Sequence, residues 1–118
     1  MNSIRALKDA ELLSSTRALV QREREVTTQV LRYLAEIERR KLYCDLKTKD
    51  GLKYGSLFDY AVRELGYSEA AASRRIQAMR LVREIPEIEA KIESGALNLS
   101  NVSQAQSFFR DIKRAEPE

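Results

Sequence analysis

The chain has 118 residues, of which 43% are hydrophobic, and this is enough for one small domain with a modest core. It carries 21 Lys and Arg against 18 Asp and Glu, for a net charge of +3, and it contains no His and a single Cys. Chemistry that needs a histidine base, a Cys/His zinc site or an internal disulfide is therefore excluded for these residues.

Other catalytic and targeting signals are also missing from the sequence. There is no GxxxxGK[ST] or GxGxxG motif, and the carboxylates of Glu36 and Glu38, like those of Glu87 and Glu89, lie two positions apart and point to different faces of a helix. We therefore expect no catalytic residue, metal, cofactor or small-molecule substrate. The absence of a long apolar run and of a signal-peptide pattern predicts a cytoplasmic protein that does not contact membranes.

The pattern of apolar residues predicts an all-α fold. Gly and Pro are scarce, and apolar residues recur every three or four positions, as they do along helices packed against a core. We expect a long N-terminal helix followed by a bundle that contains a helix-turn-helix, with about five helices in all. The predicted divisions are a tail at 1–8, a scaffold or dimerisation helix at 9–43, a basic loop at 44–55, the helix-turn-helix bundle at 56–112, and a tail or linker at 113–118.

The long helix at 9–43 carries an apolar stripe and a polar side. It is either one helix or two nearly collinear ones with a break near Ser14 and Ser15. Because so long an apolar stripe needs another surface to bury it, the helix is interpreted as a scaffold, or else as a candidate contact for a homodimer or another partner. The stripe comprises Leu12, Leu19, Val26, Val30, Leu34 and Ile37, and the side expected to face solvent carries Gln21, Glu25, Arg32 and Arg39.

A basic loop, CDLKTKDGLKYG, follows the long helix at 44–55. It holds two of the four Gly residues, as is typical of a connection between helices. Its charged side chains are either hydrated or in contact with a phosphate backbone. The candidates for phosphate contact are Lys47, Lys49 and Lys53.

Two capped helices separated by a glycine turn come next. Ser56, with Asp59 three positions later, predicts the start of a short helix that runs through Leu65. Gly66 supplies the positive φ of a sharp helix exit, and Ser68 caps the following helix. This order of helix, short turn and helix is typical of a helix-turn-helix, whose second helix enters the major groove of DNA.

The second helix has a face suited to reading DNA. Its buried side is expected to carry Ala72, Ile76 and Met79, with Val82 at the edge, and its open side Ala70, Ser73, Arg74, Gln77 and Leu81. Arg74 can pair with a guanine edge, Gln77 with an adenine edge, and Ser73 with a base or a phosphate. Beside the buried side, Arg75 and Arg80 are expected to contact phosphates or internal carboxylates.

The rest of the chain predicts two more helices. Pro86 marks the start of the first, and Gly95 ends it. Ser100 is the predicted cap of a last helix that begins near Asn101. Its apolar side is expected to carry Val102, Ala105, Phe108, Phe109 and Ile112.

The order LGYSEAAASRRIQAMRLVREIPEIEAKIESGALNLSNVSQAQ resembles the DNA-binding core of the ParB/KorB partition family. Over about Leu12 to Phe109 the chain is also similar to the region in front of the nuclease module in a group of bacterial HNH endonuclease-like proteins, in the segments ERRKLY and SLFDYAVRELGYSEAAASRRI. That resemblance implies a recognition helix that uses Ser68, Glu69, Ala70, Ser73, Arg74 and Gln77. The nuclease module itself needs His and Asn around a divalent metal, so this chain, which has no His, is not expected to cut DNA.

The sequence therefore predicts a non-catalytic domain that binds double-stranded DNA through a recognition helix at about 69–83. The full set of candidate contacts is Ser68, Ala70, Ser73, Arg74, Gln77, Arg75, Arg80, Lys47, Lys49 and Lys53. Two alternatives stay open. The arginines can instead form surface ion pairs in a helical protein–protein interaction module, or the chain is the DNA-engaging fragment of an HNH nuclease whose catalytic domain lies elsewhere.

Overall fold

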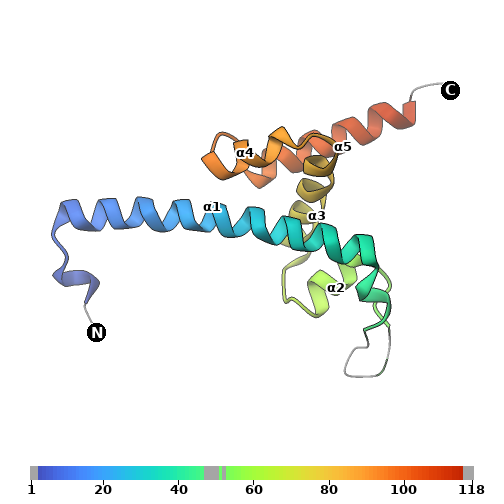
Figure 1. Ribbon diagram of the computed structural model, residues 1–118, viewed down its shortest axis with the longest axis horizontal. Helices are drawn as coiled ribbons and strands as arrows, with labels where there is room; N and C mark the ends of the chain where they lie inside the picture. Colours follow the sequence, from blue (N-terminus) through green and yellow to red (C-terminus); the bar gives the residue numbers. More distant parts are fainter. Residues whose placement is uncertain (1–2, 47–50, 52, 116–118) are drawn as a thin grey trace.

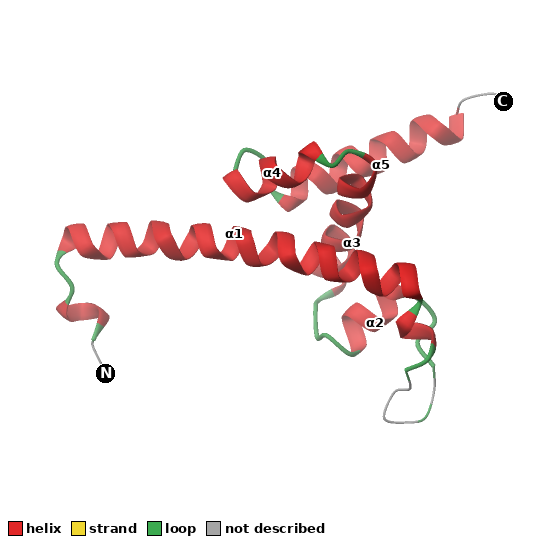
Figure 2. Ribbon diagram, in the orientation of Figure 1, coloured by secondary structure: helices red, strands yellow, loops and turns green. Residues whose placement is uncertain are grey.

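The computed structural model describes residues 3–46, 51 and 53–115, and every element in this part of the chain is helical (Figure 2). The prediction of an all-α fold with a long N-terminal helix is confirmed. The helices are α1 (Asp9–Arg40), α2 (Leu57–Arg63), α3 (Glu69–Glu84), α4 (Glu87–Ser94) and α5 (Leu99–Ala115), with short 3-10 turns η1 (Ile4–Ala6) and η2 (Leu42–Cys44).

Helix α1 is one continuous helix of 32 residues, without a break at Ser14 or Ser15. It ends at Arg40, three residues before the predicted end. Lys41 adopts the left-handed conformation, with φ 54°, and its N–H donates to the carbonyls of Ile37 and Glu38. A left-handed residue closes the last helical turn, and here that turn leads into η2.

Helix α3 is the centre of the molecule, because it contacts each of the other four α-helices (Figure 1). Ala72, Ile76 and Met79 are buried as predicted, and Val82 is half-buried at the edge. Leu81 was predicted to face solvent, and this prediction is wrong: its exposure is only 1%. Helix α5 packs against α3, so α3 is buried on two sides and a one-sided amphipathic pattern describes it poorly.

The core takes one or two large side chains from each remaining helix. Leu31 and Leu34 come from α1, Leu57 from α2, Ile92 from α4 and Val102 from α5, all at 4% exposure or less. Together with the buried face of α3 they form one cluster. The five helices therefore share one core, which holds the turn between α2 and α3 in place.

Only the C-terminal half of α1 takes part in that core. Every residue from Asp9 to Val20 is exposed, and Leu12 and Leu19 expose 39% and 60% of their surface. In a single copy the apolar stripe is thus uncovered at Leu12 and Leu19, while Leu34 on the same stripe is buried. The bundle is too small to reach the first turns of α1, which extend past it on the left of Figure 1.

The last helix begins earlier than predicted. It starts at Leu99, and Asn98 rather than Ser100 provides the cap, since its Oδ1 accepts from the N–H of Asn101 at 2.8 Å. Gly95 ends α4 with φ 86°, as predicted. Val102 is buried and Ala105 half-buried, whereas the side chains of Phe108, Phe109 and Ile112 lie outside the described part of the structure.

Candidate nucleic-acid interface

Two side-chain caps and a glycine turn fix the geometry between α2 and α3. The Oγ of Ser56 accepts from the N–H of Asp59 at 3.0 Å, and the Oγ of Ser68 accepts from the N–H of Ala71 at 3.1 Å. Between them Gly66 has φ 80°, and the N–H of Tyr67 donates back to the carbonyl of Ala61 at 3.2 Å. These bonds satisfy backbone groups that a helix end leaves unpaired, so α3 starts at a defined point and direction.

The N-terminal end of α3 is exposed to solvent. Ser68, Glu69 and Ala70 are exposed, while Ser73 and Gln77, one and two turns further along, are half-buried. The Nε2 of Gln77 donates to the Oγ of Ser73 at 3.0 Å. Two of the side chains predicted to read bases are therefore bound to each other. Within α3 the exposed residues are Glu69 and Ala70 at its start and Arg83 and Glu84 at its end.

The arginines of α3 divide into two groups. Arg80 and Arg83 both donate to the carboxylate of Glu38 on α1, at 3.0 Å and 2.9 Å. Of the two roles expected for Arg80, the structure therefore shows the internal carboxylate contact.

The other two arginines have no carboxylate partner within the described residues. Arg75 lies 4.5 Å from the ring centroid of Tyr67 and donates to the carbonyl of Ala71 at 3.1 Å. Arg74 is half-buried and forms no hydrogen bond or ion pair with any described residue. Two cations thus remain near the N-terminal end of α3 that the fold does not neutralise.

The end of the loop before α2 is anchored by an aromatic side chain that the sequence analysis missed. Tyr54 is 5% exposed, its hydroxyl donates to Glu64 at 2.6 Å, and its ring meets that of Tyr60 edge to face at 5.6 Å. Lys53, next to it, is exposed. Lys47 and Lys49, the other two lysines predicted to contact phosphate, lie outside the described residues.

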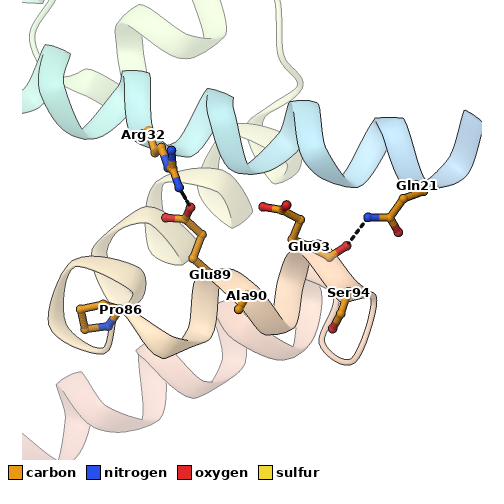
Figure 3. A pocket seen from close by; sticks show the side chains of 7 residues that line it. All are labelled: Gln21, Arg32, Pro86, Glu89, Ala90, Glu93 and Ser94. Carbon is orange, nitrogen blue, oxygen red and sulfur yellow. Dashed lines mark hydrogen bonds and ion pairs between the residues drawn. The ribbon is translucent and has the colours of Figure 1, made fainter.

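A shallow polar cleft between α1 and α4 has a structural role (Figure 3). Arg32 forms an ion pair with Glu89. The Nε2 of Gln21 donates to the carbonyl of Glu93 at 2.9 Å, and the Oγ1 of Thr28 donates to its carboxylate at 3.2 Å. Gln21 was predicted to face solvent but is half-buried, because α4 lies against this side of α1. Arg32 is exposed as predicted, although it pairs with Glu89 of α4.

The acidic side chains of this cleft are paired within the fold. These carboxylates are engaged by α1, and the described residues include no group of three side chains able to hold a metal ion. Glu36 on the outer surface of α1 is likewise engaged: hydrogen bonds from Arg39 and Arg40 lower its pKa to about 2.

The contact between Glu38 and the two α3 arginines makes stability depend on pH. Burial raises the pKa of Glu38, but the hydrogen bonds from Arg80 and Arg83 outweigh it, so the pKa lies below its usual 4.5. A carboxylate with a lowered pKa stabilises the fold above the unfolded-state value, and this contribution disappears as the pH falls through the lowered pKa. We expect Glu38→Gln to unfold in less urea than wild type at neutral pH, with the difference shrinking below pH 4.5.

Urea titrations of both proteins across that pH range measure this effect. Glu25→Gln is the matched control, since Glu25 is an exposed carboxylate on the same helix. A difference between wild type and Glu38→Gln that stays constant with pH would show that the amide substitution itself, rather than the lost charge, is responsible.

No family model, curated protein or solved structure matches the chain. The resemblance to ParB/KorB and HNH-associated regions accordingly stays a prediction. No helix in the described part of the chain is long and apolar enough to cross a membrane.

Proposed function

We propose that the chain is a non-catalytic module that binds double-stranded DNA with α2 and α3 as a helix-turn-helix. In such motifs the N-terminal residues of the second helix contact base edges while the first helix lies across the backbone. The start of α3 suits this geometry, since Ser68, Glu69 and Ala70 are exposed there.

The observation that carries this proposal is the contrast among the α3 arginines. Arg80 and Arg83 are bound to Glu38, whereas Arg74 has no partner in the described part of the chain. Because no described residue pairs with its guanidinium, Arg74 can donate to a ligand without first breaking an ion pair. The guanine edge and the phosphate are both acceptors that suit the forked geometry of arginine.

Helix α3 also offers a second cation for the phosphate backbone. Arg75 is already oriented by the ring of Tyr67, so less side-chain freedom is lost when it contacts a ligand. Lys53 is a further exposed candidate, in the segment before α2. Glu69, on the same open end, opposes phosphate and fits the interface only where it accepts from a cytosine amine.

Fluorescence anisotropy with a labelled random-sequence duplex tests the proposal. We expect binding that weakens by orders of magnitude between about 50 and 200 mM salt, because bound arginines release counterions from DNA. Arg74→Ala is expected to cost about 1–3 kcal/mol of binding free energy. Arg83→Ala removes the same charge from the same helix at a position already paired with Glu38, and it is expected to bind almost as wild type does.

Equal losses for the two variants would mean that only net charge matters, and the α3 interface would be wrong. An absence of binding at low salt would leave the protein–protein interaction module as the better reading. That second candidate is favoured by one specific observation, the exposed apolar side of α1.

A further inference from the structure

The exposed N-terminal half of α1 is hard to account for in a single copy of the chain. Residues Asp9 to Val20 are all exposed, and they include Ser14, Ser15 and Thr16, which favour helix only weakly. An isolated helix of this length is marginal in water without packing. This part of α1 continues from the packed C-terminal half, but it gains no stability from tertiary packing in a single copy.

The apolar residues on the open side of α1 follow a heptad pattern. Leu12, Leu19, Val26 and Tyr33 are seven residues apart, and Val30 and Ile37 each lie four residues after a member of that series. From Val26 to Ile37 the steps alternate between four and three, which is the spacing of a coiled-coil seam. In the N-terminal half the corresponding positions are Thr16 and Glu23. The six apolar residues are called the α1 stripe below. Its members Val26 and Tyr33 are 56% and 74% exposed, so the bundle leaves much of the seam open.

The C-terminal part of the stripe forms one wall of an apolar groove of about 430 Å³. Val30, Tyr33 and Ile37 line it from α1, and Leu65 and Tyr67 line it from the turn before α3. This α1 groove continues toward the N-terminus in a second hollow, which is lined by Leu19 and Val26 together with Tyr67 and Arg75. The side chains of the stripe are therefore exposed in the N-terminal half of α1, and they line a groove in its C-terminal half.

We propose that a second copy of the chain covers this surface in an antiparallel α1–α1 dimer. In the register that sets Leu12 against Ile37 of the second copy, Leu19 lies against Val30 of the second copy. A two-fold axis near the middle of α1 makes both contacts occur twice. The exposed N-terminal part of the stripe in each copy then occupies the α1 groove of the other copy. The paired stripe extends over about 38 Å of helix. The dimer does not depend on DNA binding.

The charges at the two ends of α1 select the antiparallel orientation. Asp9 and Glu11 lie in the first turn, next to Lys8, and Lys41 follows the last turn, where Arg39 and Arg40 are paired with Glu36. An antiparallel pair sets each acidic end beside the basic end of the other helix, and it opposes the two helix dipoles. A parallel pair would bring acidic beside acidic and basic beside basic.

Sedimentation equilibrium of the full chain, from low to high micromolar concentration, measures the association. We expect the mass to rise from 13.6 kDa toward twice that value. Leu19→Asp buries a charge in the seam and is expected to stay monomeric throughout, with an unchanged circular dichroism spectrum at low concentration because Leu19 is exposed in the monomer. Ala18→Asp adds the same charge one residue away, off the stripe, and is expected to dimerise as wild type does.

Cross-linking tests the orientation. In a Cys44→Ser background, Asp9→Cys and Arg40→Cys proteins are mixed and treated with a short bifunctional thiol reagent. An antiparallel dimer gives a product only from the mixture, whereas a product from Asp9→Cys alone would show a parallel pair and overturn the proposal. It is equally overturned if wild type stays monomeric at high micromolar concentration, or if Ala18→Asp blocks association as strongly as Leu19→Asp does.

A negative result for DNA binding and a negative result for dimerisation can be told apart. Arg74→Ala changes no residue of the α1 stripe, so it is expected to leave the equilibrium mass unchanged whatever it does to DNA binding. Leu19→Asp, conversely, lowers the mass of the protein without altering α3.

Discussion

Leu81→Ala is expected to lower the free energy of unfolding by about 2–5 kcal/mol, the range measured for truncation of buried leucines. Leu81 is 1% exposed and lies on the side of α3 away from Ala72, Ile76 and Met79. Replacing its isobutyl side chain with a methyl group would leave a cavity in the cluster that joins the helices. Because small domains have a total stability of only about 5–15 kcal/mol, this one change can consume much of it.

Urea unfolding at low micromolar protein measures the change. Leu13→Ala, the same substitution at a side chain that is 67% exposed, is expected to stay within about 0.5 kcal/mol of wild type. If both variants unfolded like wild type, Leu81 would face solvent as its helical pattern alone suggests, and α5 would not cover this side of α3.

Ala72→Leu is expected to destabilise the protein by about 1–3 kcal/mol through overpacking, and to weaken DNA binding with it. Ala72 has no exposed surface, and Ala61 on α2 exposes only 1%. Both belong to the one core cluster, and α2 packs directly on α3. A leucine at 72 would need space that the closely packed helices do not leave, so the turn between them would have to shift.

Ala70→Leu separates stability from DNA binding. Ala70 is exposed on the same helix, so we expect its unfolding free energy to stay within about 0.5 kcal/mol of wild type. At the end of α3 proposed to enter the groove, however, the larger side chain would stand between helix and base edges, and anisotropy should show weaker DNA binding. Unchanged DNA affinity for Ala70→Leu would place the interface somewhere other than this end of α3.

Local signals in the sequence were sufficient to predict the starts of α2 and α3 and the turn between them. Ser56, Gly66 and Ser68 act on backbone groups within four residues of themselves, so their roles can be read from neighbouring letters. The cap of α5 was misplaced because Asn98 and Ser100 are both good capping residues, and only the backbone bond to Asn101 distinguishes them.

The contacts between distant parts of the chain could not be predicted in the same way. Leu81 is buried by α5, Gln21 and Arg32 meet α4, and Glu38 binds arginines 42 and 45 residues further along. A helical wheel divides one helix into an apolar and a polar side, but it does not say how many neighbours that helix has. Arg80 and Arg83 therefore resemble Arg74 in the sequence, although their surroundings in the fold are different.

The extension of α1 beyond the bundle also affects how the molecule moves through solution. The radius of gyration is 17.9 Å, whereas a compact chain of this length has about 13 Å. The principal dimensions of 59 × 42 × 21 Å describe a flattened, elongated particle with high frictional drag. A single copy should therefore leave a gel-filtration column early, at the volume of a heavier globular protein. Light scattering would still give the mass of a single copy, because the scattered intensity does not depend on the shape that sets the elution volume.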